Sequence, residues 1–262
     1  FPALDVAAWL RAVREQALDE LDLEHAAGLQ RRVARAVRDV DGLVVPAVHG
    51  ALAAPGVLVA DRLAGPTLAD ERPDDPARAA RVLLAAHVTA ARAGIAPVNP
   101  RPEHVVLLGA GRLGLLGTGA AVPVDRPRVE AWLRALAAVR GEQARALGRA
   151  LAADLGVLAT EDAEAALALA RGIFGALATG PARLDAATLA AAGGRAIDAL
   201  PAVFDLVRRG SPVPEDAALA RMLGQLALVL ARLGASEDWL APAATRPPAR
   251  AGPRSPRSER RP

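Results

Sequence analysis

The side chains best suited to chemistry lie in the proline-rich run Asn-Pro-Arg-Pro-Glu-His, which begins at Asn99. Asn99 can form hydrogen bonds, but its amide cannot accept a proton as a carboxylate does. His104 is a poor magnesium ligand because magnesium prefers hard oxygen donors, whereas Glu103 offers a carboxylate. Two interpretations stay open: a remodelled nucleotide or metal pocket, or a loop that keeps its proline-set backbone without chemistry.

The elements beside this loop are indicated by the residues that begin and end them. Asp75 before Pro76 predicts a helix start, and the helix is expected to run to Ala93 and end at Gly94. After the loop come two short apolar runs, 105–108 and 113–116, separated by Gly-Ala-Gly-Arg. This pattern predicts a hairpin.

The N-terminal part predicts one long helix followed by a hairpin. Asp5 can cap a helix from residue 6 to 40, with a break expected near Asp22. The runs 43–48 and 57–60 are rich in valine and separated by a Gly/Pro/Ala loop. They indicate two paired strands.

The chain after Pro127 predicts helices throughout. Gly193 and Gly194 are expected to weaken or kink the fourth of these helices, and Gly234 to end the last. The predicted helices are 128–139, 142–155, 161–178, 185–208 and 215–233. The fold class is therefore expected to be α+β and dominated by helices.

Composition and charge exclude several classes of protein. With no cysteine, the chain has no disulfides, thiolate metal sites or cysteine nucleophiles. The net charge is +3, but the segment from Thr245 onward carries +5, which leaves −2 on the rest and gives no support for a nucleic-acid surface. No signal peptide is visible, and the most apolar helix, 217–233, carries charges, so no transmembrane segment is expected.

Three segments together resemble the UbiB/AarF/ADCK family of atypical kinase-like proteins. The run Glu20-Leu21-Asp22 is similar to the family's E-x-D motif, and 57–61 followed by Gly65 is similar to its strand and hinge, V-L-V-M-E-x-x-x-G. The segment 94–119 is similar to G-F-x-H-A-D-P-H-P-G-N followed by D-G-R-x-x-L-L-D-F-G. The match covers about residues 15–122, with weaker helical similarity to about residue 239.

The resemblance implies a protein-kinase-like lower lobe with part of an upper lobe, and it assigns roles to residues. The expected regions are a partial upper lobe in 1–62, a lower lobe in 63–240 and a disordered Arg/Pro-rich tail in 241–262. Asn99 stands at the catalytic Asp position, and His104 and Gly117 stand at the two metal-ligand positions. The nucleotide-side positions are those of Glu20, Asp22 and Asp61.

The resemblance also implies a pathway, cofactors and partners. ATP and magnesium are the cofactors of the family. Because the base and both metal ligands are replaced, the first hypothesis is a catalytically impaired protein. It is expected to act by binding a protein partner or an isoprenoid-type lipid in isoprenoid quinone or lipid metabolism, in the cytoplasm or at a membrane surface.

Two further hypotheses remain. The chain contains no lysine, although the family uses one on the nucleotide phosphates, and that lysine would lie upstream of Phe1. The second hypothesis is therefore an ATP-binding kinase or ATPase with altered ligands, or one with its lysine upstream. A third is a scaffold that works through the helices between residues 128 and 239. His87, within an apolar helix, is expected to be a packed, hydrogen-bonded core residue.

Overall fold

Helices dominate the computed structural model, which describes residues 7, 10, 11, 14, 18, 21–54, 56–208, 210 and 213–245. The helices are α2 (Leu23–Val37), α3 (Pro76–Arg92), α4 (Arg126–Arg140), α5 (Ala144–Gly148), α6 (Ala163–Phe174), α7 (Ala186–Asp198), α8 (Leu200–Val207), α9 (Pro214–Leu233) and α10 (Ala241–Ala244). The strands are β1 (Leu43–Val44), β2 (Ile95–Pro97), β3 (Val105–Leu108), β4 (Arg112–Leu115), β5 (Ala121–Pro123), β6 (Ala182–Arg183) and β7 (Ser236–Glu237). The expected helix-dominated α+β class is confirmed.

Aspartate side chains begin four of the helices. The carboxylate of Asp22 accepts hydrogen bonds from the backbone N–H groups of Glu24 and His25, each at 3.0 Å, so α2 starts at Leu23 and the break expected near Asp22 is confirmed. Asp75, Asp125 and Asp185 cap α3, α4 and α7 in the same way. The part of the predicted 6–40 helix that precedes residue 21 lies largely outside the described residues.

The strands form small sheets beside α2 and α3. β3 pairs antiparallel with β4, which confirms the predicted hairpin, and β2 pairs antiparallel with β5. The predicted pairing of 43–48 with 57–60 is reduced to one bridge, between Val48 and Ala60. The beginning of that run, β1, pairs instead in parallel with β4, so the prediction was wrong for Leu43 and Val44.

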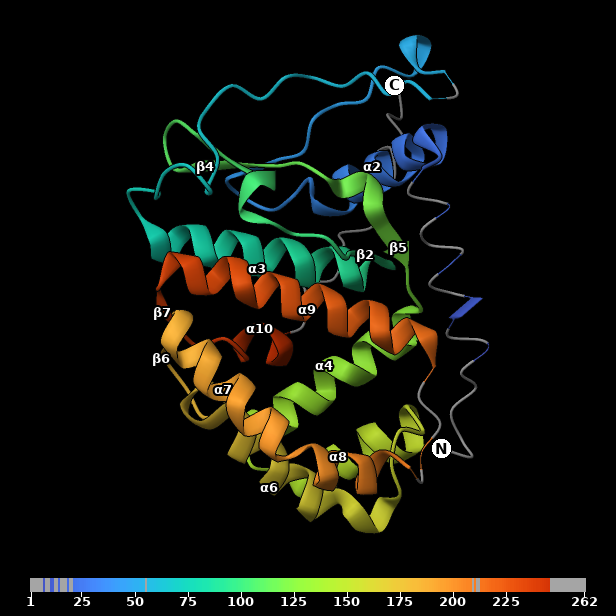
Figure 1. Ribbon diagram of the computed structural model, residues 1–262, viewed down its shortest axis with the longest axis vertical. Coiled ribbons are helices and arrows are strands. Elements are labelled where there is room, and N and C mark those ends of the chain that lie inside the picture. Colours follow the sequence, from blue (N-terminus) through green and yellow to red (C-terminus); the bar gives the residue numbers. More distant parts are fainter. Residues whose placement is uncertain are drawn as a thin grey trace, which may run out of the picture.

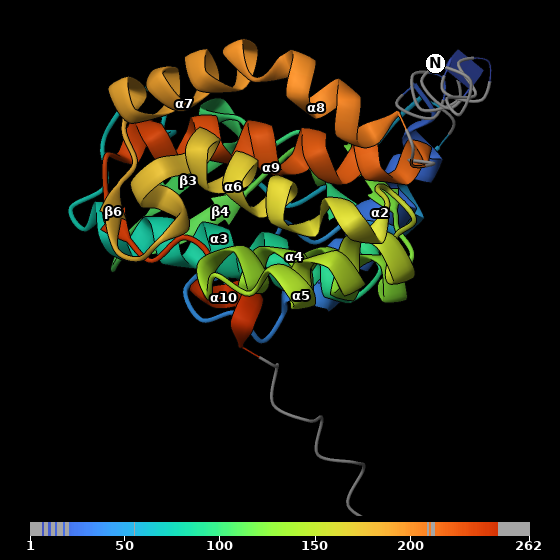
Figure 2. The same cartoon turned by 90° about the horizontal axis from the view of Figure 1, so that it is seen from below.

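Two long helices lie side by side across the middle of the molecule. Figure 1 shows α3 next to α9, with α2, β4 and β5 on one side and α4, α6 to α8 and β6 on the other. Seen from below, α6 crosses in front of α9, between the α7–α8 pair and the α4–α5 pair (Figure 2). The loop that follows β2, which carries the candidate site residues, therefore lies on the side of α2, β4 and β5, away from α6 to α8.

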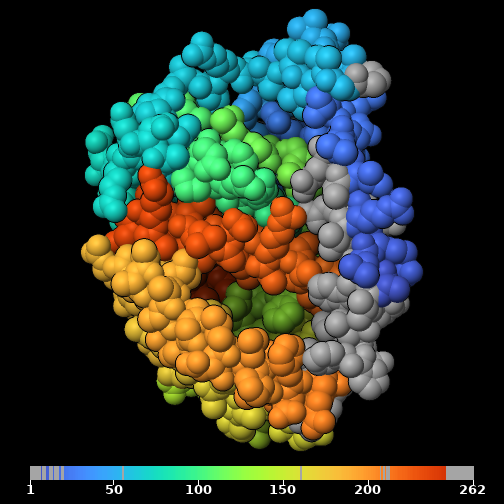
Figure 3. Space-filling view, in the orientation of Figure 1, coloured from blue at the N-terminus to red at the C-terminus, as the bar shows by residue number. Residues whose placement is uncertain are grey.

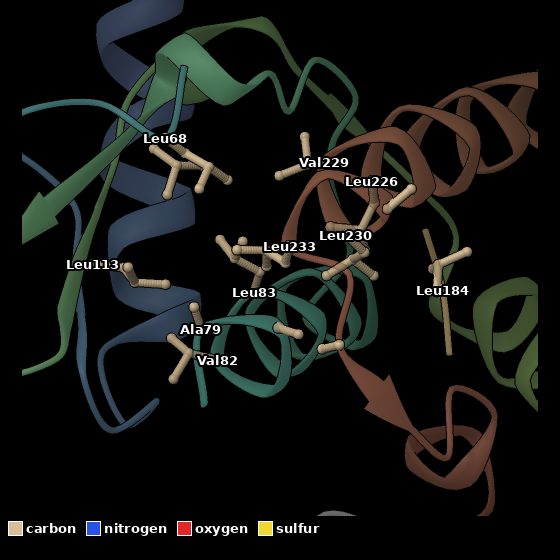
Figure 4. Packing of buried hydrophobic residues seen from close by; sticks show 14 of the residues in the cluster. Leu68, Ala79, Val82, Leu83, Leu113, Leu184, Leu226, Val229, Leu230 and Leu233 are labelled. Carbon is tan, nitrogen blue, oxygen red and sulfur yellow. The ribbon is translucent and has the colours of Figure 1, made fainter. Parts of the chain in front are cut away.

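Small and branched aliphatic side chains fill the core between α3 and α9. Figure 4 shows Leu83 of α3 and Leu226 and Leu230 of α9 in one cluster with Leu68 and Leu113. A second cluster joins α2 to α3 and β2 through residues such as Val33, Ala86 and Ile95. The boundary expected after residue 62 stays a prediction, and this second cluster contains residues from both sides of it.

Several predicted helices are shorter or divided. The predicted helix 185–208 breaks at Ala199 and not at Gly193-Gly194, because Pro201 cannot supply the backbone N–H that a continuous helix needs, whereas α7 runs through both glycines. The predicted helix 142–155 is α5 followed by a π-helical segment, Arg149–Asp154, and 161–178 ends its α-helical part before Gly175. The tail expected from 241 begins with α10, and 246–262 lies outside the described residues.

Candidate functional site

The loop that carries Asn99 and His104 is held against the end of the β3–β4 hairpin. A short 3₁₀ turn, Pro102–His104, leads directly into β3. The backbone N–H of His104 donates to the carbonyl of Arg101 at 3.0 Å, and the N–H of Leu116 donates to the carbonyl of His104 at 2.7 Å. These bonds bring Asn99, His104 and Gly117 together.

The imidazole of His104 lies directly over Gly117. A Cβ atom at position 117 would stand 2.5 Å from His104 Nδ1 and 2.8 Å from Cε1, closer than side chains approach one another. Gly117 also has φ of 67°, in the left-handed region that favours glycine. The histidine therefore occupies the space into which an Asp side chain at position 117 would begin.

His104 is fixed in this position by a hydrogen bond within the loop. Its Nδ1 lies 3.1 Å from the backbone carbonyl of Asn99. Since a carbonyl only accepts, Nδ1 carries the hydrogen, and moving the ring away from Gly117 would break this bond. The space between positions 104 and 117 is thus filled by one packed, hydrogen-bonded ring.

The side chain of Asn99 is engaged by a neighbour in the same loop. Its Oδ1 accepts a hydrogen bond from Nε of Arg101 at 3.0 Å. Nη1 of Arg101 lies 3.7 Å from Oε1 of Glu103, an exposed pair of the kind that contributes little stability. A guanidinium therefore stands beside Asn99, where the family's catalytic Asp would accept a proton.

Helix α2 packs against the Gly-Thr-Gly segment that follows Gly117. A Cβ on Gly119 would lie 3.0 Å from the Cβ of Ala26 and 3.3 Å from its carbonyl oxygen, so the helix and the 3₁₀ turn Thr118–Ala120 are in close contact. Thr118 is buried, and its hydroxyl oxygen has no hydrogen-bond partner in the structure. An acidic side chain in place of Ala26 would not fit this contact.

Asp22 and Asp61, two of the predicted nucleotide-side acids, form their described bonds with residues outside this loop. Asp22 caps α2 through its carboxylate, and Asp61 is exposed and lies 2.7 Å from Nε2 of His49. Glu20 lies outside the described residues. Among the residues that the structure places, no group of three His, Asp or Glu side chains could hold a metal ion.

His87 is a packed residue of the core, as the sequence predicts. It is fully buried in α3, and its Nδ1 lies 2.8 Å from the carbonyl of Leu83. Burial lowers the pKa of the His87 imidazole, and the bond to Leu83 opposes this only in part. The ring is therefore neutral at physiological pH.

Sequence reasoning missed the contacts that fill the site. The hydrogen bond between Arg101 and Asn99 could have been expected from the sequence, because the two residues lie two positions apart in one loop. The contact of Ala26 with Gly119 has only a weak signal in the sequence: Ala26 is a small residue at about the place where the resembling family has an acidic one. The position of the His104 ring over Gly117 depends on the hairpin geometry, which residue spacing alone does not give.

Comparisons with known proteins give a similarity of fold. No family profile and no curated protein matches this sequence. Among solved structures, the complex of Rv3197 with erythromycin from Mycobacterium tuberculosis is similar, with a TM-score of 0.61 and 17% sequence identity. The similarity covers 85% of this chain and 57% of that one, so the chain spans little more than half the length of this neighbour. At this identity the similarity concerns the fold alone.

Proposed function

We propose that this chain is a catalytically impaired member of the UbiB/AarF group of kinase-like proteins and acts by binding. The observation that carries the proposal is the His104 ring, which occupies the space of a side chain at position 117 and is hydrogen-bonded to Asn99. Phosphoryl transfer depends on placed charges and metal ions, and losing one such contact commonly reduces the rate about a hundredfold to a thousandfold.

The order and pairing of the elements support the assignment to this group. The loop with Asn99 lies between β2 and β3, the Gly-Thr-Gly segment lies between β4 and β5, and α2 packs on that segment. This agrees with the arrangement that the resemblance implies for the segment 94–119. If Asn99, His104 and Gly117 hold the positions of the catalytic Asp and the two metal ligands, ATP and magnesium have lost their main protein ligands here.

The role left to such a domain is binding, of a protein partner or of an isoprenoid-type lipid in quinone or lipid metabolism. The solved neighbour is a complex with erythromycin, so a protein of this fold binds a small organic molecule. No helix in the described part of the chain is long and apolar enough to cross a bilayer. A role at the membrane surface would thus use a face of the protein and not a described helix that spans the bilayer.

A second candidate, an ATP-binding enzyme with altered ligands, is favoured by one observation. The carboxylate of Glu103 is exposed beside Asn99 and is held only by the 3.7 Å approach of Arg101. It could supply a displaced metal ligand. In this case the chain would hydrolyse ATP in a magnesium-dependent way, and Glu103→Gln would reduce the rate.

The two candidates are separated by phosphate release from ATP. We expect no magnesium-dependent release by the wild-type chain, and no difference for Glu103→Gln or His104→Ala. An exposed substitution such as Glu71→Gln serves as the matched control. Release that requires magnesium and falls at least tenfold in Glu103→Gln, but not in the control, would replace the first candidate with the second.

A further inference from the structure

We propose that the cavity bounded by α4, α6, α8 and α9 is a binding site for an uncharged, hydrocarbon-rich small molecule. The cavity has a volume of about 580 Å³, within the range of about 300–1,000 Å³ that is usual for ligand sites. It lies away from the Asn99 loop. In the space-filling view the surface is hollowed between α9 and the α7–α8 pair, with part of α4 visible at the bottom (Figure 3).

The walls of the cavity are almost wholly apolar. Trp132, Leu158, Phe174 and Leu206 contribute side chains from four different parts of the chain. The chain has only six aromatic residues, three Trp and three Phe, and two of them line this one cavity. Aromatic side chains in a concave apolar space are typical of small-molecule sites.

The charged group at the wall, Asp216, is fully engaged by protein donors. Its carboxylate accepts hydrogen bonds from Nε of Arg128 at 2.7 Å, from the indole N–H of Trp132 at 2.7 Å and from the backbone N–H of Val213 at 3.0 Å. Burial raises the pKa of Asp216, but the hydrogen bonds from Arg128, Trp132 and Val213 together outweigh this effect and the net shift is downward. Asp216 therefore remains ionised and paired.

Because Asp216 is already paired with Arg128, the described residues of the cavity wall offer no free charge to a charged ligand. None of the described residues that line the cavity is an Arg, Lys or His, so an anionic head group would find no cation there. A cationic one would compete with Arg128 for a carboxylate that is already satisfied. Transfer of an unpaired charge into such a space is costly, whereas each buried methylene is favourable by about 0.8 kcal/mol. The occupant is therefore expected to be neutral.

The volume of the cavity favours a small molecule over a protein segment. A volume of about 580 Å³ is in the range of sites for small organic molecules. A partner helix would need a longer groove to bury several turns.

One wall of the cavity, α8, is suited to adjust to a ligand. None of the described residues of α8 is buried, although the helix is apolar: Leu200 and Phe204 are 43% and 48% exposed. Val203 and Leu206 of α8 line the cavity, and Leu206 also packs against the cluster of buried residues from α4 to α6. Segments with few buried apolar contacts lie at the low-stability end of a fold and are the ones that move on binding.

The inference deepens the binding role in the proposed function, and its test does not depend on ATP. The neutral dye N-phenyl-1-naphthylamine becomes fluorescent in apolar sites and is the probe. We expect saturable binding to the full chain, displacement by 1-dodecanol, and displacement by dodecanoate only at concentrations at least tenfold higher. Farnesol in place of dodecanol distinguishes an isoprenoid from an acyl-chain source.

Two matched variants on opposite sides of α6 test whether the dye binds in this cavity or in the neighbouring one. Ala170→Phe places a ring in the cavity, whereas Ala165→Phe makes the same change where α6 lines a neighbouring cavity of about 560 Å³ that contains Arg195 and Asp205. Ala220→Phe tests the α9 wall at an exposed position, where the change is compatible with folding. We expect at least tenfold weaker dye binding for Ala170→Phe and Ala220→Phe and no change for Ala165→Phe.

Because the chain contains no cysteine, a single introduced thiol can report on whether a ligand covers the cavity wall. Val203→Cys places a thiol at the cavity wall, and Ala202→Cys places one on the exposed, neighbouring position of α8 that does not line it. Dodecanol should slow the reaction of a maleimide with Cys at 203 at least fivefold and leave Cys at 202 unchanged.

Results that contradict the proposed cavity site differ from results that contradict the proposed function. Unsaturable dye binding, equal loss in Ala165→Phe and Ala170→Phe, or equal protection of the two thiols would overturn the site. Each of these results would leave the absence of ATP hydrolysis untouched. Conversely, magnesium-dependent hydrolysis would contradict impaired catalysis while the cavity still bound its ligand.

Discussion

At the scale of single residues, the pair His104 and Gly117 decides what this fold can do. In the family that the sequence resembles, these positions bind the metal through an Asn and an Asp. Here one side chain has been lost, and the other occupies the space that remains, with a hydrogen bond to the Asn99 carbonyl. The two substitutions are therefore physically coupled, and restoring one of them alone would disturb the loop.

We predict that Gly117→Ala is strongly destabilising and that His104→Ala relieves part of the effect. The left-handed backbone at position 117 costs a side-chain-bearing residue about 1–2 kcal/mol, and contact with the imidazole adds to this. Urea unfolding should give a loss of more than about 2 kcal/mol in Gly117→Ala and a coupling energy of about 0.5–3 kcal/mol in the double-mutant cycle.

Gly109→Ala, in the same hairpin, is the matched control. A Cβ there meets no atom within 4 Å, so the expected change is within about 0.5 kcal/mol. A coupling energy near zero between His104→Ala and Gly117→Ala would show that the ring does not rest on Gly117 in solution.

A second residue-scale prediction concerns Asp185 and acid. The backbone N–H of Thr188 is the main donor to its carboxylate, followed by the Arg183 guanidinium and the Thr188 hydroxyl, and together they lower the pKa of Asp185 to about 2. A carboxyl group with a lowered pKa in the folded state stabilises the fold fully above its ordinary value of 3.8. That stabilisation is lost as the pH falls from about 4 to 2.

The prediction is checked by the urea concentration at the midpoint of unfolding, measured for wild type and Asp185→Asn between pH 5 and pH 2. Asn keeps an oxygen for the helix cap but does not titrate in this range. We expect the variant to lose less stability than wild type on acidification. Parallel curves for the two proteins would show that Asp185 does not carry this contribution.

At the scale of elements, the position of α2 closes the site from the other side. The helix begins at a capping Asp22, and its buried face packs toward α3 and β2. The close approach of Ala26 to Gly119 exists because both residues are small. An acidic residue at position 26 would hold α2 away from the Gly-Thr-Gly segment.

We predict that Ala26→Glu destabilises the fold by at least about 2 kcal/mol. The change places a charge without a partner in a buried contact. Ala34→Glu on the half-buried side of the same helix is the control, with an expected change below about 1 kcal/mol. Equal stability of the two variants in urea unfolding would mean that α2 is not docked on Gly119.

At the scale of the whole molecule, the sequence predicted the parts whose signals are local. The Asp75-Pro76 start, the Gly94 and Gly234 ends and the β3–β4 hairpin follow from residues beside each feature, and the structure contains them all. The class of fold followed from the same signals. The tripartite division of the chain and the kinase-like function stay predictions.

The features that depend on contacts between distant segments were not predictable. The parallel pairing of β1 with β4 joins residues about seventy positions apart, and no pattern in either strand indicates it. The glycine pair Gly193-Gly194 predicts a weak point in the helix 185–208, but the helix breaks at Ala199, because Pro201 lacks a backbone N–H and packing keeps both glycines helical. The apolar cavity is formed by four helices, each of which reads in the sequence as an ordinary amphipathic segment.

The central proposal is that the loop of Asn99, His104 and Gly117 stands where the resembling family binds magnesium and ATP, and that here it does not hold them. Thermal unfolding of the chain with and without Mg²⁺–ATP tests it most directly. A ligand at about one hundred times its dissociation constant stabilises the folded state by about 2.7 kcal/mol, which raises the midpoint by several degrees for a chain of this size. We predict no magnesium-dependent change in the midpoint. A reproducible increase that requires both magnesium and ATP would contradict the account.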